Sequence, residues 1–483
     1  MPYRFVLLFI GEFDIMKVVI YEQLYAKYLP EALMGTRQFK KKALKPAQIM
    51  VLSFAGVILI GALILMLPIS SQARVVTPFI NAIFTATSAV CVTGLVVVDT
   101  GTYWSVFGKT VILILIQIGG LGFMTMTTTI AILLGKKIGL KNRLVMQEAL
   151  GQFSIAGVIR LTKYVFIATI SIELIGALLL SIRFIPLFGW KNGIYYSIFH
   201  SVSAFCNAGF DLMGSYQGLA PFARDPIVNL TIMTLIVLGG LGFIVLAELS
   251  TFKSYQKLSL HTKIVLLMTG SLILGGFIII MILEFNNPNT IGNFTLGEKV
   301  VASLFHSITP RTAGFNTLDL NALAMPTRFI TMILMFIGGS PGSTAGGLKT
   351  TTVAIMLLSI IALFKGSEEI NFANRRVSKE SVTRSLGIVF ISTIWIVTMS
   401  LLLTVFEPNR SLEAIIFESL SAFGTVGLSL GITPSLSIMG KVILAIMMFF
   451  GRIGPLTIVF ALSNRRTNSS RDLLRYPEGK IMV

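Results

Sequence analysis

The chain has 483 residues, of which 54% are hydrophobic and only 12% are charged. Soluble domains carry charge on about a quarter of their residues, so this composition excludes an ordinary soluble protein and predicts a polytopic membrane protein. The formal net charge of +18 is compatible with nucleic-acid binding, but membrane proteins accumulate lysine and arginine in their cytoplasmic loops. The positions of these residues therefore decide between the two classes.

The first predicted membrane unit lies in the N-terminal part of the chain. Residues 1–46 form a basic segment, and residues 47–67 then supply the roughly 20 apolar residues that one membrane-spanning helix needs. Residues 76–91 predict a shorter half-helix that leads to a loop around Gly94, and residues 110–134 predict a second span. The unit is thus a helix, a half-helix, a loop and a returning helix.

The same unit recurs three more times. The outgoing spans are predicted at 165–187, 264–283 and 386–405, and the returning spans at 227–249, 329–364 and 442–462. We therefore expect an all-α protein with eight membrane spans, in which four tandem repeats surround one pseudo-fourfold ion pore. The expected segments are a basic N-terminal segment 1–46, repeats at 47–137, 138–257, 258–366 and 367–464, and a basic tail 465–483.

The distribution of charge gives the orientation independently. Five segments on the same predicted side hold 27 of the 39 lysines and arginines; they are residues 1–46, 135–163, 252–263, 365–384 and 464–483. Because positive residues favour cytoplasmic loops, these segments are predicted to face the cytoplasm. We expect a multi-pass protein of the cell membrane with both termini inside, whose surroundings are the lipid bilayer and not nucleic acid.

A short motif joins the half-helix of each repeat to the returning span. It begins with Phe, has Ser or Thr one turn later, and ends in a small residue, a glycine and an apolar residue. The motif glycines follow one another at intervals of 115, 105 and 113 residues; they are Gly94, Gly209, Gly314 and Gly427. The fourth copy is the best preserved, because it contains Thr425-Val426-Gly427, and the third copy is one residue short.

These four loops predict a shared ion-binding site. Non-helical backbone is tolerated inside a bilayer only where protein or a water-filled cavity covers it, so the loops are expected to meet on one axis. Backbone carbonyls in such loops can replace the hydration shell of a potassium ion, and glycine adopts the backbone angles that this requires. Potassium, bound through carbonyls, is the only metal expected. The predicted filter residues are Val92, Thr93, Gly94, Asn207, Ala208, Gly209, Thr312, Ala313, Gly314, Thr425, Val426 and Gly427.

A glycine-rich stretch interrupts the third returning span. Five glycines and a proline within ten residues cannot propagate a helix, so the span is predicted to break at membrane depth. A phosphate-binding loop is the alternative, but Leu348 stands where that motif requires lysine and no β-strand precedes it. The residues of this predicted gating loop are Gly338, Gly339, Ser340, Pro341, Gly342, Ser343, Thr344, Ala345, Gly346 and Gly347.

Arg452 lies in the fourth returning span at the repeat position of the glycine-rich stretch. A charge inside the membrane is costly and indicates a function. If Arg452 faces the pore, it sets an electrostatic barrier to cations and forms part of the gate. The alternative is a buried ion pair with Glu173 or Glu248. Lys349, at the end of the glycine-rich stretch, is predicted to extend toward the inner surface.

With four such repeats and a glycine in each loop, residues 45–465 resemble the Trk/Ktr/HKT superfamily of potassium transporters. Two additional N-terminal spans typical of the Trk branch are absent, so the chain is most similar to the Ktr membrane subunit and is KtrB-like. Plant-type members that prefer sodium carry serine at the first filter glycine, whereas Gly94 is intact here.

The resemblance implies potassium uptake through a filter that an intramembrane loop gates. It also implies a homodimer seated on a separate cytosolic ring of KtrA-like subunits that bind nucleotides. No cofactor is expected in this chain, and potassium is the transported ion, with sodium as a candidate activator.

Two other classes of function were weighed. A secondary cation symporter with alternating access commonly has inverted repeats, whereas these repeats run in parallel and have equivalent loops. An enzyme would need a metal cluster of histidines and cysteines, paired intramembrane carboxylates or a nucleophile motif, and the sequence has none of them. An ion-conducting pore is therefore the leading prediction, with the symporter as its alternative.

Overall fold

The computed structural model describes residues 46–122, 158–252, 258–367, 369–455 and 457–458. Within these ranges the chain is helical apart from loops, short 3-10 turns and one small hairpin. The hairpin pairs β1 (Asn371–Phe372) with β2 (Arg375–Arg376), and Asn371 lies opposite Arg376. The predicted basic tail 465–483 and almost all of the basic segment 1–46 lie outside the described residues.

Four described helices are long and apolar enough to cross a membrane. They are α2 (Pro46–Met66), α8 (Val158–Phe205), α11 (Leu260–Glu284) and α15 (Lys379–Phe406). Each contains one of the outgoing spans predicted from the sequence. In α8 the outgoing span runs on into the second half-helix, with Pro186 and a left-handed Gly189 (φ 77°) marking a kink between them.

The half-helices are short and deeply buried. They are α3 (Phe79–Val90), the C-terminal part of α8, α12 (Leu296–Ile308) and α16 (Leu412–Gly424). Polar caps satisfy the orphan amides at two of their N-termini, since Thr295 and Glu298 form a capping box on α12 and Ser411 accepts the Ala414 N–H of α16. The first Phe of each motif is at most 1% exposed; these residues are Phe84, Phe199, Phe305 and Phe417.

Every described returning helix breaks, which corrects the prediction of unbroken spans in repeats 1, 2 and 4. The broken helices are α5 (Val106–Leu121), α9 (Pro226–Leu241) followed by α10 (Phe243–Ser250), α13 (Met325–Phe336) followed by α14 (Thr350–Phe364), and α17 (Ile438–Ile453). The axis turns by 103° between α9 and α10. Gly122, Gly242 and Gly454 stand at the breaks with φ of 82°, 98° and 91°, angles that side chains oppose and glycine accepts.

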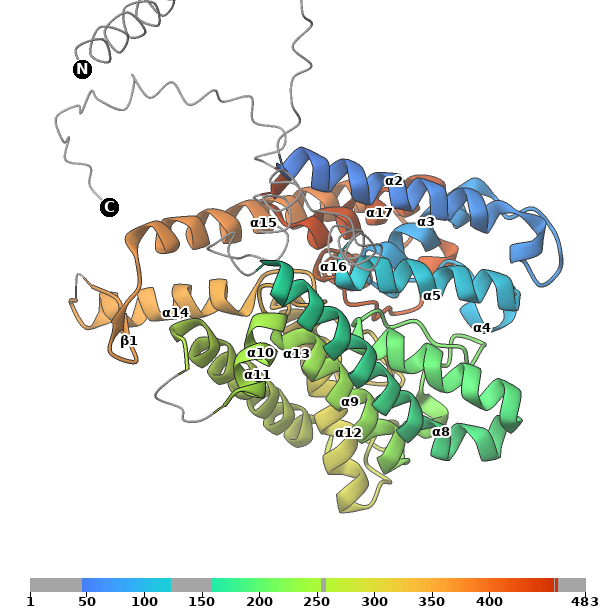
Figure 1. Cartoon of the computed structure of the whole chain (residues 1–483), viewed down its shortest axis with the longest axis horizontal. Coiled ribbons are helices and arrows are strands. Elements are labelled where there is room, and N and C mark those ends of the chain that lie inside the picture. The colour runs from blue at the N-terminus through green and yellow to red at the C-terminus, as the bar shows by residue number, and fades with distance from the viewer. Residues whose placement is uncertain (1–45, 123–157, 253–257, 368, 456, 459–483) are drawn as a thin grey trace, which may run out of the picture. The chain divides into compact units, whose positions relative to one another are not determined.

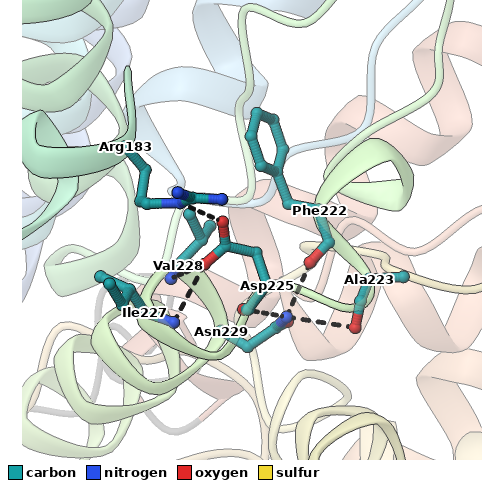
Figure 2. A network of polar contacts seen from close by, with 7 residues as sticks. All are labelled: Arg183, Phe222, Ala223, Asp225, Ile227, Val228 and Asn229. Atoms are coloured by element: carbon teal, nitrogen blue, oxygen red, sulfur yellow. Dashed lines mark hydrogen bonds and ion pairs between the residues drawn. The ribbon is translucent and has the colours of Figure 1, made fainter. Parts of the chain in front are cut away.

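Buried polar residues tie each returning helix to the outgoing helix of its repeat. Glu284 accepts the Ala324 N–H at the start of α13 (2.9 Å), and Glu407 accepts the Ser437 N–H at the start of α17 (2.7 Å). In repeat 2, Arg183 of α8 pairs with Asp225, the N-cap of α9, at 2.5 Å (Figure 2). These contacts fix the outer ends of the helix pairs, because a buried polar group is costly unless it is hydrogen-bonded.

The repeats contact one another in cyclic order. Between repeats, α5 contacts α8, α9 contacts α12, α13 contacts α16, and α17 contacts α3. The helices at the two ends of the described chain therefore lie beside each other, as the blue and red ribbons of Figure 1 illustrate. The four half-helices and their loops are brought together at the centre of this arrangement.

Candidate functional site: a ring of four loops

Each motif loop contains two residues with left-handed backbone. One is the motif glycine, with φ between 67° and 95°, and the other stands two positions before it. These second residues have φ between 50° and 69°; they are Val92, Asn207, Thr312 and Thr425. A β-branched residue such as Val92 rarely adopts this conformation, so the surrounding structure must hold the loop in place.

The four loops form a closed ring. A Cβ added to any motif glycine would lie within 3.0 Å of a carbonyl oxygen in the next loop. The contacts join Gly94 to Ala208, Gly209 to Ala313, Gly314 to Val426, and Gly427 back to Thr93. Four carbonyl oxygens therefore approach one another around a common centre, and none of the four glycine positions has room for a side chain.

A buried hydroxyl holds each loop near its glycine. Ser88 accepts the Gly94 N–H and Ser421 accepts the Gly427 N–H, both at 3.1 Å. In the other two repeats the hydroxyl donates to the carbonyl one residue after the glycine, from Ser203 to Phe210 (2.7 Å) and from Thr309 to Phe315 (2.5 Å). The Ser or Thr that recurs in the motif is thus explained by its contact with the ring.

The outer rim of the ring is formed two residues after each glycine. These residues are half-buried, whereas the residue before each of them is buried; they are Val96, Asp211, Asn316 and Ser429. Asp211 is the one acid in this register. Burial raises the pKa of its carboxyl to about 6, and the nearby Asp99 charge adds to the shift.

On the opposite side of the ring, glycines let the returning helices approach the half-helices. A Cβ on Gly119, Gly239 or Gly451 would overlap the carbonyl oxygen of the residue four positions before the motif glycine of the same repeat. Those oxygens belong to Val90, Phe205 and Phe423, respectively. The breaks in the returning helices follow three residues after these contacts.

The glycine-rich stretch is folded into a compact loop beneath the ring. Its two ends pair, because the Gly338 N–H donates to the Leu348 carbonyl at 2.8 Å and Ile337 forms a bridge with Leu348. It docks on the break of α9, where the Ser340 N–H donates to the Gly240 carbonyl (3.0 Å). Gly346 packs against the side chain of Thr425, a residue of the fourth ring loop.

Thr344 anchors the middle of this loop. Its backbone N–H donates to the Gly239 carbonyl at 3.2 Å, and its hydroxyl lies 3.0 Å from the same oxygen and 3.1 Å from the Phe205 carbonyl. The loop is therefore fastened both to α9 and to the end of the second half-helix. The sequence predicted that the span breaks here but not that Thr344 is the anchor.

Arg452 joins three elements below the ring. Its guanidinium donates to the Thr344 carbonyl of the loop and to the Gly119 carbonyl of α5, and it lies 3.1 Å from the Gly120 carbonyl. The predicted alternative of a buried ion pair is wrong. Glu173 instead accepts from Gln117 (3.3 Å) and Glu248 accepts from the Ser259 hydroxyl (3.0 Å).

Lys349 does not extend to the inner surface as predicted. Its Nζ folds back and donates to the Ala345 carbonyl of the loop at 2.7 Å. The side chain therefore caps the loop, and a second positive charge lies on the same side of the ring as Arg452. In the described residues, no group of histidine, cysteine and acidic side chains is arranged to hold a metal ion.

This arrangement is that of a helical membrane protein with a carbonyl-lined passage, and comparison with known proteins agrees. Residues 16–470 match the family model TrkH, described as a cation transport protein. The chain therefore belongs to the TrkH/Ktr family of cation transport proteins, as the sequence resemblance predicted, and members of this family are transporters and not enzymes.

Individual relatives cover nearly the whole chain. It is 47% identical over 441 residues to the Ktr system potassium uptake protein B of Bacillus subtilis, covering 91% of this chain and 96% of the relative. It is 42% identical over 447 residues to the potassium/sodium uptake protein NtpJ of Enterococcus hirae, covering 92% and 98%. Its fold matches the crystal structure of the potassium transporter TrkH from Vibrio parahaemolyticus with a TM-score of 0.69 at 17% identity, covering 89% and 87%.

Proposed function

We propose that this chain is the membrane subunit of a potassium uptake system of the Ktr type and conducts potassium through the ring of four loops. The observation that carries the proposal is the closed ring, in which each motif glycine abuts a carbonyl oxygen of the next loop. Converging backbone carbonyls replace the water shell of a dehydrated potassium ion. The predicted filter residues, from Val92–Gly94 to Thr425–Val426–Gly427, are the residues that supply these carbonyls.

The loop over residues 338–347, together with Arg452, is proposed as the gate. It lies against the cytoplasmic side of the ring in the proposed topology, and the fixed positive charge of Arg452 opposes a cation leaving the filter. The loop is held by hydrogen bonds and packing and not by covalent links, so it can be released. Removal of those bonds would open the path without altering the ring.

The proposed setting is the cell membrane, with eight spans around one pseudo-fourfold pore and both termini in the cytoplasm. Many large apolar side chains on the long helices are exposed, for example Leu59, Leu178 and Ile282, which suits a lipid-facing surface. Ktr system relatives support a partner within such a system. We propose a homodimer that binds a cytosolic KtrA-like ring, with sodium as a candidate activator.

The proposal is tested by ion flux into liposomes that contain this chain alone. Potassium and rubidium should enter at similar rates and sodium more slowly, because rubidium resembles potassium in size and the ring is rigid. Equal rates for all three ions would contradict a potassium-selective filter. The alternating-access alternative instead predicts uptake that depends strictly on a gradient of a second ion.

Asp211 should make potassium uptake depend on external pH. Its pKa of about 6 means that the carboxyl is charged above this pH and takes up a proton below it, so the outer rim loses one negative charge on acidification. Uptake at low potassium should fall by about threefold between about pH 7.5 and pH 5, because fewer cations are attracted to the rim.

The pH dependence is checked with two asparagine variants. Asp211→Asn should have low uptake at both pH values and little dependence on pH. Asp319→Asn is the matched control, since Asp319 is an exposed acid of another outer loop. If Asp211→Asn retains the full pH dependence of the native protein, Asp211 does not act at the rim.

A further inference from the structure

One position of the motif remains unexplained by the proposed filter and gate. Directly after the first Phe, the half-helices carry Thr85, His200, His306 and Glu418. In repeats 1 and 3 this side chain bonds within the helix layer, from Thr85 to the Asn81 carbonyl (2.8 Å) and between His306 and Thr331 (3.1 Å). In repeats 2 and 4 it reaches the segment that follows the ring.

Glu418 is fully buried and has a donor for each carboxylate oxygen. Ser429 donates to Oε1, and Thr433 donates to Oε2 at 2.9 Å. The backbone N–H of Leu430 also hydrogen-bonds this carboxyl. Ser429 belongs to the outer rim, and Leu430 is three residues after Gly427, so the carboxyl is joined to the chain directly above the fourth ring loop.

His200 makes the equivalent contact in repeat 2. Its Nε2 lies 3.3 Å from the backbone N–H of Leu212, which is three residues after Gly209, and its Nδ1 lies 2.7 Å from the Tyr196 carbonyl. The same position in two non-adjacent repeats therefore holds the chain at the same distance from the ring. A recurring contact of this kind indicates a function in the ring and not a local packing accident.

We propose that Glu418 is a positioning residue that sets the ion selectivity of the ring by fixing the outer end of its fourth loop. The carboxyl does not reach the ion path; it holds Ser429, Leu430 and Thr433, and these hold the Val426 and Gly427 carbonyls at the spacing that favours potassium. Both oxygens of a carboxylate accept hydrogen bonds, which matches the three donors around it. This inference rests on the proposed potassium function and adds a residue outside the predicted filter.

Glu418→Gln is the direct test, since it keeps the shape but replaces one acceptor with a donor that faces donors. The potassium-to-sodium flux ratio in liposomes should fall by about tenfold, the effect expected when one hydrogen bond to a charged group is lost. Glu407→Gln is the matched control: Glu407 is also buried in repeat 4 and binds the Ser437 N–H, away from the ring. This control should lower thermal stability and leave the flux ratio unchanged.

Two further variants keep the test decisive if Glu418→Gln does not fold. Ser429→Ala and Thr433→Val each remove one donor to the same carboxyl, and each should lower the flux ratio in the same direction by a smaller factor. Folded variants with the native flux ratio would overturn the inference while leaving the proposed function intact. If the native chain shows no preference for potassium, the proposed function itself fails first.

Discussion

Gly94→Ser and Gly314→Ser should each lose most of the preference for potassium over sodium. A side chain at either position meets a carbonyl of the next loop, from Ala208 at Gly94 and from Val426 at Gly314, so those carbonyls must shift. The left-handed backbone adds about 1–2 kcal/mol of strain for a non-glycine residue. Because about 1.4 kcal/mol corresponds to a factor of ten, the potassium-to-sodium flux ratio should fall at least about tenfold.

Gly366→Ser is the control for this prediction. Gly366 has a similar left-handed backbone (φ 63°), and a Cβ there meets nothing within 4 Å. The control variant therefore introduces comparable backbone strain without moving a ring carbonyl, and its flux ratio should remain native. Native selectivity in both ring variants would mean that the four loops do not discriminate between the ions.

The ring was predictable because each of its loops carries the same local signal. Phe, Ser or Thr, and glycine recur at fixed spacing, and the structure explains them as a buried anchor, a hydroxyl that holds the loop, and a position without room for a side chain. The order in which the loops contact one another also follows from chain order. Local chemistry, repeated four times, was sufficient to identify these residues.

The breaks in the returning helices were missed, although the sequence contains a signal for them. Repeats 1 and 2 carry Gly-Gly-Leu-Gly, ending at Gly122 and Gly242, and repeat 4 carries Gly451-Arg-Ile-Gly454. Average hydropathy conceals such a break, because a single glycine in an apolar run changes the average little while its backbone turns the chain. Only the third repeat, with five glycines and a proline, gave a signal strong enough to predict.

The partners of Arg452 could not be predicted from sequence at all. Its acceptors in α5 and in the loop are 332, 333 and 108 residues away along the chain. In the repeated pattern Arg452 stands where repeats 1, 2 and 3 have Gly120, Gly240 and Gly339. A large charged side chain at that position reaches across the centre because the other three repeats leave room for it.

Arg452→Gln should increase potassium flux per folded molecule by about tenfold or more without changing ion preference. The guanidinium bonds three carbonyls of the loop and of α5, and hydrogen bonds to charged groups contribute about 1.5–3 kcal/mol each. Glutamine removes the charge and most of these bonds, so both the electrostatic barrier and the attachment of the loop weaken. Arg452→Lys retains the charge but not the planar fork, and should have the smaller effect.

Thr344→Val separates the charge from the loop. It removes the hydroxyl contacts to the Phe205 and Gly239 carbonyls but keeps Arg452 and the backbone carbonyl that Arg452 binds. If the loop is the gate, this variant also raises flux, whereas a barrier made of charge alone predicts native flux. Residues in direct contact give non-additive effects, so the double variant should exceed Arg452→Gln by less than the product of the single effects. Native flux in both single variants would exclude a gate at this position.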